Sequence, residues 1–391
     1  MRVTHHFTHV DREANVYHET PFEVPGGAPA VSVVLAYDRA SAVVDLGVFD
    51  PERFRGWSGS ARDGFVITPA AATPGYLPGP LPPGTWNVLL GLHQLPPGGV
   101  DVTVTAAVEA APLPPEESPP SRPERPPACD LPAHPDRRWL AADFHSHSTH
   151  SDGELSIAAL ACLAAARGLD VLAVTDHNTV SHHPHLAAAG AHAGIRLVPG
   201  QEITTETGHA NCFGNVGWVD FRRPADTWWQ TAERNGGLVS INHPLVDGYG
   251  WQKQTARSMP LVEAWHSSWD RSSDAPLKWW SRRGGVPIGG SDFHRRGADA
   301  PPGSPTTWVE VEDDDVIGAL AAGRVALSYA PRRPVLLRHD GDLVAIDADG
   351  ATLVGADGTR TRVHGDAVRL PDAAGTQRLV DDRGRTLALV P

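Results

Sequence analysis

The stretch WLAADFHSHSTHSDGE, residues 139–154, decides how the rest of the chain is interpreted. Apolar residues lead into His145, and His147 follows after a single intervening residue. Residues two apart in an extended strand project to the same side, so both imidazoles can reach one point. Asp152 follows in a Ser-Asp-Gly turn and adds a carboxylate. The spacing predicts a metal-binding strand end, although two such histidines on a half-exposed strand are more often simply solvated.

Later in the chain, several short apolar runs also end in a histidine or a carboxylate. They lead, in order, to Asp176, His177, Glu202, His243, His266, Asp292 and His294, while His209 opens a further short run. Short apolar runs between helical segments are typical of buried parallel strands. In a barrel of parallel strands wrapped by helices, the carboxyl ends of all strands meet on one face. We therefore expect these polar side chains to share one pocket.

The pattern in this part of the chain alternates between helix and strand. Helices are expected at residues 156–166, 185–193, 225–234 and 314–322. Strands are expected at residues 170–175, 195–198, 238–241, 261–265, 286–289 and 306–311. Ser156 can cap the first helix, and Gly168 can end it.

The flanking regions have other compositions and predict other structures. Residues 1–110 hold short apolar runs between Gly and Pro turns, the first clear one at 30–37, and predict a β-sandwich of roughly eight strands. Residues 111–138 open with APLPPEESPPSRPERPP. Proline fixes φ and lacks an N–H, so this segment is expected to be a semi-rigid linker. Residues 139–329 would be the metal-bearing domain, and residues 330–391, with their Asp-Gly turns, a small β region.

The composition of the chain bears on which kinds of partner and compartment are expected. The chain has 33 Lys and Arg against 46 Asp and Glu, a formal charge of −13. Broad attraction to a nucleic-acid backbone is therefore not expected. Cys129, Cys162 and Cys212 have neither disulfide nor CxxC spacing. Without an apolar leader or a run of about 18 apolar residues, the chain is expected to be cytoplasmic and not membrane-bound. Its oligomeric state stays open.

Six imidazoles and three carboxylates make up the predicted metal set. Its members are His145, His147, Asp152, His177, Glu202, His209, His243, Asp292 and His294. Mixed nitrogen and oxygen donors suit Zn, Mn or Fe. Because one ion needs about four ligands, the set can serve two or three divalent ions if a carboxylate bridges.

The motifs HSHSTHSDG, TDHN, PGQE, GHANCFG, NHP and GGSDFH together resemble the polymerase and histidinol phosphatase (PHP) superfamily, over residues 139–325. The preceding β region and the GHANCFG and VEAWH elements resemble its CehA/McbA metallohydrolase branch. The resemblance implies a distorted (β/α)7 barrel with a two- or three-metal centre. It also implies a phosphoesterase, here acting on a small phosphorylated molecule.

The same resemblance implies an assignment of ligands to ions. The first ion would be held by His145, His147, Glu202 and Asp292. The second would be held by Asp152, His177 and the shared Glu202. The third would be held by His209, His243 and His294. Some relatives have a histidine where this chain has Asp152, which bears on metal preference.

The expected reaction uses a hydroxide that bridges the ions on either side of Glu202 and attacks phosphorus. Asp292 would hold or accept the proton of the water. Asp176 would orient a neighbouring ligand, because ligating imidazoles usually donate their other N–H to an acceptor.

The substrate contacts are predicted from position alone. Arg295, Arg296 and Lys253, together with Arg257, could each pair with a phosphate oxygen, and plain surface exposure is the alternative for each. Trp251 in the GYGW loop is the candidate wall of the pocket.

Two further functions remain open on the sequence. The same centre could hydrolyse an ester, carbamate or amide at a carbonyl carbon, or the chain could be a non-catalytic metal-bearing binding module. His150 is expected to have a surface or supporting role, and His266 is ambiguous. The histidines after TDHN are expected to be exposed, namely His182, His183, His185 and His192.

Overall fold

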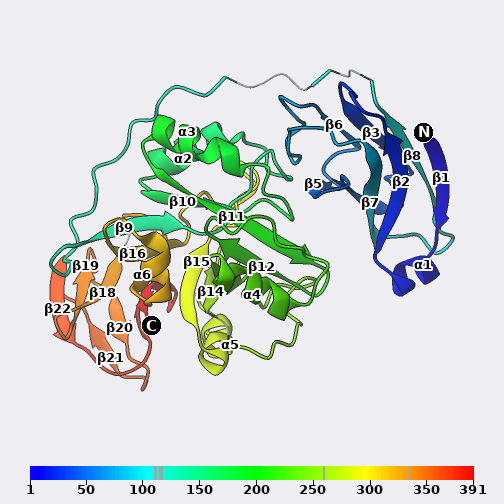
Figure 1. Ribbon diagram of the computed structural model, residues 1–391. Coiled ribbons are helices and arrows are strands. Elements are labelled where there is room, and N and C mark those ends of the chain that lie inside the picture. Colours follow the sequence, from blue (N-terminus) through cyan, green and yellow to red (C-terminus); the bar gives the residue numbers. More distant parts are fainter. Residues whose placement is uncertain (110–111, 114–117, 259, 333) are drawn as a thin grey trace. The chain divides into compact units, whose positions relative to one another are not determined.

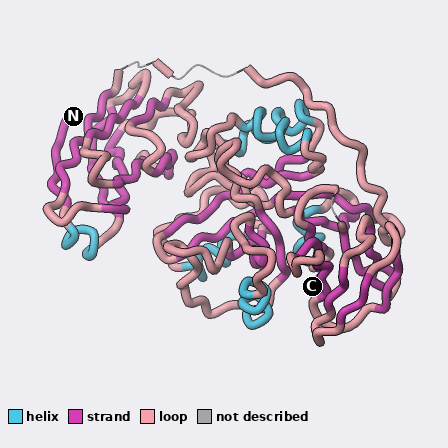
Figure 2. The backbone as a smooth tube through the Cα atoms, turned by 180° about the vertical axis from the view of Figure 1, so that it is seen from behind, coloured by secondary structure: helices cyan, strands magenta, loops and turns pink. Residues whose placement is uncertain are grey.

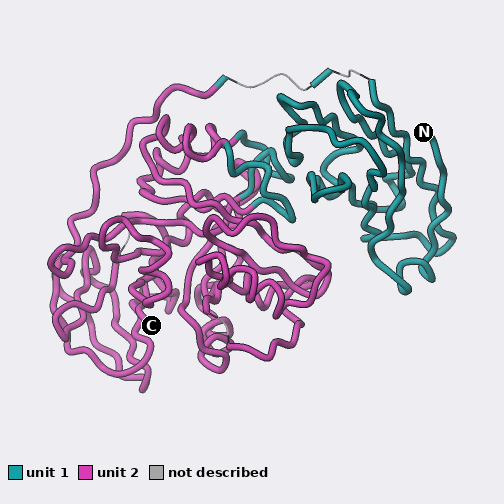
Figure 3. The backbone as a smooth tube through the Cα atoms, viewed as in Figure 1, with its two compact units in different colours: residues 1–118, 147–156, 176–184 teal, residues 119–146, 157–175, 185–391 magenta. Residues whose placement is uncertain are grey.

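The computed structural model describes residues 1–109, 112–113, 118–258, 260–332 and 334–391 (Figure 1). They form a mixed α/β structure with two compact units, coloured separately in Figure 3. Unit 1 comprises Met1–Ser118, His147–Ser156 and Asp176–Pro184, and unit 2 comprises Pro119–Ser146, Ile157–Thr175 and His185–Pro391. Positions 111 and 114–117 of the predicted linker lie outside the described residues. The domain boundaries expected from the sequence stay a prediction.

The N-terminal part of unit 1 consists of antiparallel β-sheets, as predicted (Figure 2). One four-stranded sheet has the order β1-β8-β3-β6 and the other the order β2-β7-β4-β5. The strands are β1 (Arg2–Phe7), β2 (Tyr17–Val24), β3 (Val31–Ala36), β4 (Val43–Phe49), β5 (Phe54–Gly59), β6 (Gly64–Ile67), β7 (Gly84–Gln94) and β8 (Val100–Ala107). Alternating side chains of both sheets, such as Val33, Val104, Leu46 and Trp86, are buried in one common core.

The first elements of unit 1 differ from the expectation that strands begin near residue 30. β1 and β2 come earlier and are joined by the short helix α1 (His9–Ala14). Thr8 caps this helix in a capping box with Asp11. Polar residues outnumber apolar ones in these segments, so their strand pattern is weak in the sequence.

Unit 2 is built on one large sheet of both parallel and antiparallel strands. Its first seven strands in chain order are β9 (Arg137–Asp143), β10 (Val171–Val174), β11 (Arg196–Thr205), β12 (Gly208–Phe213), β13 (Leu238–Ile241), β14 (Leu261–His266) and β15 (Val286–Gly290). Neighbours in this series pair in parallel, except that β12 is antiparallel to both β11 and β13. All four residues of β10 are buried, which explains its uninterrupted apolar sequence.

Helices alternate with the strands of this unit, and all but the one at Ala275–Arg283, which the sequence did not predict, lie close to their expected positions. They are α2 (Ile157–Ala166), α3 (His183–Ala193), α4 (Ala225–Arg234), α5 (Ala275–Arg283) and α6 (Val316–Ala321). Gly168, two residues after the end of helix α2, has a φ of 92° that favours glycine. The N–H of Leu169 then donates to the carbonyl of Ala164, closing the C-terminal turn.

A closed barrel stays a prediction. β15 stands at one end of the strand order, and the order continues from β9 to β16 (Thr306–Glu312) and β17 (Val325–Ser328). Just beyond β9 and β15, however, Ser146 and Phe293 form a parallel bridge, and Asp292 donates its N–H to the carbonyl of His145 at 2.9 Å. The carboxyl ends of these two strands therefore meet.

The C-terminal strands are divided between two sheets. β20 (Thr352–Val354), β21 (Arg360–Arg362), β23 (Gln377–Val380) and β24 (Thr386–Val390) extend the large sheet beyond β17. A separate three-stranded sheet contains β18 (Val335–His339), β19 (Asp342–Ile346) and β22 (Ala367–Pro371). In the described parts of the chain, no helix is long and apolar enough to span a membrane.

Candidate metal centre

His145 lies two residues beyond β9 and is completely buried among carboxylates. Its Nε2 is 3.2 Å from Oε1 of Glu202 and 3.1 Å from Oδ1 of Asp292. Its Nδ1 is 3.0 Å from Oε1 of Glu263. Burial alone would lower the pKa of His145, but Asp292, Glu202 and Glu263 raise it well above its ordinary value. One imidazole among three carboxylates marks a site that favours positive charge.

Glu202 lies on β11, and its carboxylate contacts imidazoles from other elements. Its Oε1 is 3.2 Å from Nδ1 of His209 and 3.3 Å from Nε2 of His243. The side-chain amide of Asn242 donates to the same oxygen at 2.9 Å. Antiparallel pairing of β11 with β12 places His209 opposite Thr204, and His243 follows β13. Glu202, His209 and His243 offer ligand atoms within 4.8 Å of one another.

Glu263 on β14 belongs to the same region, and the sequence analysis did not single it out. It is buried. Its Oε1 contacts His145, and its Oε2 accepts the backbone N–H of His243 at 2.6 Å. Burial alone would raise the pKa of Glu263, but His145 and then His266 hold it below its ordinary value. His145, Glu263 and His266 also offer ligand atoms within 4.8 Å of one another. In the sequence, Glu263 could have been found as the carboxylate of VEAWH, three residues before His266.

His266, which is ambiguous in the sequence, makes polar contacts within this region. Its Nε2 is 3.3 Å from Oδ2 of Asp292, and its Nδ1 is 2.7 Å from Oγ of Ser268. Asp292 itself is half-buried and adopts a φ of 53°. That left-handed conformation turns the chain directly after β15 and brings the carboxylate to His145.

Asp143, the last residue of β9, fixes the backbone around these side chains. Its Oδ1 accepts the N–H groups of His145 and Ser291, both at 3.1 Å, and its Oδ2 accepts that of Gly303 at 2.7 Å. Complete burial raises the pKa of Asp143, while these hydrogen bonds oppose the rise. The side chain points back into the backbone, so it positions ligands without being one.

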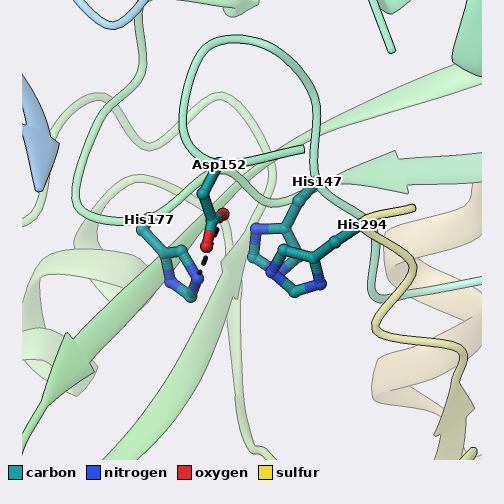
Figure 4. Close-up of side chains that lie close together, drawn as sticks. All are labelled: His147, Asp152, His177 and His294. Atoms are coloured by element: carbon teal, nitrogen blue, oxygen red, sulfur yellow. Dashed lines mark ion pairs between the residues drawn. The ribbon is translucent and has the colours of Figure 1, made fainter. Parts of the chain in front are cut away.

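His147, Asp152 and His177 form a second group, within unit 1 (Figure 4). Nε2 of His177 is 3.6 Å from Oδ1 of Asp152. The rings of His147 and His177 are stacked with centroids 4.3 Å apart. His147 is buried, His177 half-buried and Asp152 exposed. The three residues come from the loops at 147–156 and 176–184, which the sequence motifs HSHSTHSDG and TDHN mark.

Asp176 holds these two loops together. Its carboxylate accepts the N–H of Ser148 at 2.8 Å, the hydroxyl of Ser148 at 2.7 Å and that of Ser151 at 2.7 Å. Nδ1 of His182 lies 3.2 Å away. Burial alone would raise the pKa of Asp176, but the neighbouring histidines, His182 first, and these hydrogen bonds lower it to about 2. Its contacts are those of a positioning residue.

The expectation that the histidines after TDHN are exposed is wrong for His182. This side chain is fully buried beside Asp176, and His183 and His192 are half-buried, whereas His185 is exposed. His150 is buried too, with its Nδ1 2.8 Å from Oγ of Ser181. The motif lies in a loop, and loop position alone suggested exposure; the buried carboxylate of Asp176 explains why His182 is inside.

The predicted substrate residues fall into different environments. Arg295 and Arg296 are exposed. Nζ of Lys253 donates to Oγ1 of Thr207 at 2.7 Å and lies 5.2 Å from the ring centre of Trp228, and burial lowers the pKa of Lys253. His294 is half-buried, and its Nδ1 lies 2.9 Å from the carbonyl oxygen of Asp292. The substrate roles stay predictions.

The GYGW loop supplies a different aromatic contact from the one expected. Trp251 is buried against Gly208, where a Cβ would come within 3.0 Å of it. Tyr249, two residues earlier, stacks on His209 with ring centres 5.3 Å apart and meets His243 edge-on at 5.1 Å. Burial, and after it Asp292, raises the pKa of Tyr249. Nothing in the sequence of this loop distinguishes Tyr249 from Trp251 as the ring that contacts the histidines.

The donors in both groups fit divalent metal ions. Around Glu202 they combine buried imidazole nitrogens with buried carboxylate oxygens, the mixture that Zn, Mn and Fe bind. Buried carboxylates that crowd one another are stable only with compensating positive charge. Because Glu202 contacts both His145 and the His209–His243 pair, several ions can be held in this region with Glu202 shared. That His147, Asp152 and His177 serve the same ion cluster stays a prediction.

Comparison with known proteins identifies the matching family model as the PHP domain, over residues 143–256. A curated 5'-3' exoribonuclease from Haemophilus influenzae is 44% identical over 63 residues, or 16% of this chain. The match spans 23% of the length of that relative.

Two solved structures have partial fold similarity. One is a two-domain protein from Bacteroides vulgatus containing a predicted PHP-like metal-dependent phosphoesterase, with a TM-score of 0.45 and 18% identity over 68% of this chain and 99% of that one. The other is an amidohydrolase from Chromobacterium violaceum, with a TM-score of 0.33 and 16% identity over 47% of this chain and 96% of that one. Neither similarity is close enough to carry an argument about function.

Proposed function

We propose that the protein is a metal-dependent phosphoesterase that hydrolyses a small phosphorylated molecule. One observation carries the proposal: Oε1 of Glu202 lies within 3.3 Å of imidazole nitrogens of His145, His209 and His243, inside the region that matches the PHP domain. A single carboxylate oxygen among three imidazoles suits a ligand shared between metal ions. The CehA/McbA branch and a closed (β/α)7 barrel are part of the proposal.

The proposed ligands are those of the sequence assignment. They are His145, His147, Glu202 and Asp292 for the first ion, Asp152, His177 and Glu202 for the second, and His209, His243 and His294 for the third. When bound, such ions supply a hydroxide nucleophile at neutral pH and polarise the phosphoryl oxygens. Zn, Mn and Fe are the candidates.

The chain's own residues have three kinds of proposed role. Asp292 holds or accepts the proton of the attacking water, supported by its half-buried carboxylate beside His145 and His266. Asp176 and Asp143 keep the ligand-bearing loops in place through their hydrogen bonds. The exposed guanidinium groups of Arg295 and Arg296, and Lys253, contact the phosphate, while Trp251 lines the pocket.

The experiment that tests this function is a substrate panel on metal-stripped protein reloaded separately with Mn, Zn and Fe. The panel contains aryl phosphates, aryl phosphodiesters, aryl acetates and aryl carbamates, and a short RNA because the curated relative is an exoribonuclease. We expect turnover of a small phosphoester that depends on added metal. Hydrolysis of acetates or carbamates alone would replace the proposal by a carbonyl hydrolase. Metal binding without any turnover would favour a binding module.

A further inference from the structure

A cluster of two histidines and an aspartate lies in unit 2, apart from the residues described above. His134 precedes β9, His339 ends β18, and Asp340 begins the turn to β19. Each offers one ligand atom within 4.8 Å of the others. Nδ1 of His134 is 3.8 Å from Oδ1 of Asp340, and Nε2 of His339 is 3.2 Å from Oδ2 of Asp340. We propose that this cluster binds one Zn²⁺.

The donors are held in place by the fold around them. Oε1 of Glu310 accepts the backbone N–H of His134 at 2.8 Å. His339 is fixed on β18 by pairing with Asp342 of β19. Asp340 has a φ of 54°, a left-handed conformation set by the tight turn between these strands. Because the backbone already presents all three side chains, binding an ion requires little ordering of the chain.

The chemistry of the donors suits zinc. Two imidazoles and one carboxylate supply three ligands of a tetrahedral site and leave the fourth position to water. Nδ1 of His339 is buried and has no hydrogen-bond partner among the described residues, and Nε2 of the same ring faces Oδ2 of Asp340 at 3.2 Å. Among the described residues, no lysine or arginine forms an ion pair with Asp340. A cation would balance its charge.

The position of the cluster separates it from the candidate metal centre. His134 lies before the first residue of β9, and His145 lies after its last. Seven residues of strand at about 3.3 Å each place the two ends roughly 23 Å apart, too far for a shared ion. The bound zinc would instead join the segment before β9 to the β18–β19 hairpin, which belongs to the small separate sheet. Its expected effect is on stability rather than on turnover.

The test counts zinc in the full-length protein. Metal-stripped wild type, Asp340→Asn and His339→Ala are titrated with zinc, freed of excess ion and analysed for bound metal. Both variants should hold one zinc fewer than wild type and should show a smaller rise in melting temperature on adding zinc. Asparagine tolerates positive φ, so Asp340→Asn keeps the turn. His364→Ala, which removes an exposed histidine of the same C-terminal region, should match wild type.

Equal zinc content in wild type, Asp340→Asn and His339→Ala would overturn the site. An equal loss in His364→Ala would also overturn it, because the effect would then not depend on the cluster. Adding Glu202→Gln to Asp340→Asn separates this inference from the proposed function, since the two losses of metal should add. If Glu202→Gln alone loses none, the proposed function loses its main support while the zinc site stands.

Discussion

Glu202 is the residue on which the proposed chemistry depends most. Glutamine keeps the size of the side chain but removes its charge and places an amide group among His145, His209 and His243. Changes to groups that only support a metal ligand already cost about 10- to 100-fold. We therefore expect Glu202→Gln to lose more than one metal equivalent and at least about 100-fold in kcat/KM, measured by elemental analysis and phosphoester turnover.

A suitable control for this variant is Glu233→Gln, which removes an exposed carboxylate that pairs with the exposed Arg257. It should retain full metal content and turnover. If Glu202→Gln kept all its metal, Glu202 would not be a shared ligand.

Asp176 is expected to matter for stability, with a definite pH dependence. Replacement by asparagine removes the negative charge and one of the two buried acceptor oxygens of Asp176, which costs about 1–3 kcal/mol in the free energy of unfolding. The pKa of Asp176 in the fold, about 2, is below its ordinary value of 3.8. Because its pKa is lower in the folded chain, ionised Asp176 stabilises the fold fully at a pH above its pKa in the unfolded chain. This stabilisation is lost as the pH falls through the pKa in the folded chain.

Chemical denaturation of metal-free wild type and Asp176→Asn checks this expectation. The difference between the two should be fully present at neutral pH and should shrink as the pH falls from about 4 towards 2. A difference that does not change over this range would show that the ionised form of Asp176 is not the stabilising species.

At the residue scale, the sequence was most informative where a motif fixed the chemistry. His145, Glu202, His209, His243 and Asp292 were chosen from separate motifs, and the fold brings them together. The role of Glu263 could not be predicted, because it depends on which strands are neighbours. Glu263 on β14 contacts His145, which follows β9, and the sequence does not show that these two segments meet. The contact of Tyr249 with His209 could not be predicted, because the sequence of a loop does not reveal which ring faces a given side chain.

At the scale of elements, the loops at 147–156 and 176–184 are held by contacts within unit 1. Arg62, in the turn between β5 and β6, donates to the carbonyls of Thr149 and Ser151. Burial lowers the pKa of Arg62. The hydroxyl of Thr179 donates to the carbonyl of Gly75 at 2.8 Å. Neither contact was visible in the sequence, because both join loops far apart in the chain.

Arg62→Ala should therefore weaken metal binding by the loop residues. Without the guanidinium, the carbonyls of Thr149 and Ser151 lose a donor and the loop carrying Asp152 is less well fixed. We expect roughly 10-fold weaker binding of the ion held by Asp152 and His177, in the range found for supporting residues. Isothermal titration with Mn²⁺ measures it. Arg39→Ala, which alters an exposed pair with Asp63 on the same unit, should bind as wild type does.

The elements themselves were predicted best where apolar periodicity is strong. The four predicted helices and the buried strands of unit 2 occur within a few residues of their expected bounds. β1, β2 and β5 were not foreseen, because their polar or glycine-containing sequences lack alternation. The pairing of β20, β21, β23 and β24 with the large sheet was also not foreseen, since strand order is decided by contacts remote in sequence.

At the scale of the whole molecule, the division into units leads to a prediction about truncation. The loops at 147–156 and 176–184 belong to the same compact unit as residues 1–118. Deleting residues 1–118 should remove the packing partners of these loops, and we expect the loss of about one metal equivalent. The Glu202 group lies in unit 2 and should keep its ions. Elemental analysis of the two proteins measures this, and unchanged metal content would mean that the loops are fixed without residues 1–118.

The path of the chain has an evolutionary consequence. Between His145 and His185 the backbone passes from unit 2 to unit 1 and returns, twice over. The N-terminal sheets therefore cannot be exchanged like an independent module, since the segments that pack with them are encoded far downstream, inside the PHP motifs. A recombinant ancestor that acquired new N-terminal sheets would have had to remodel both loops, so the two regions should change together among descendants.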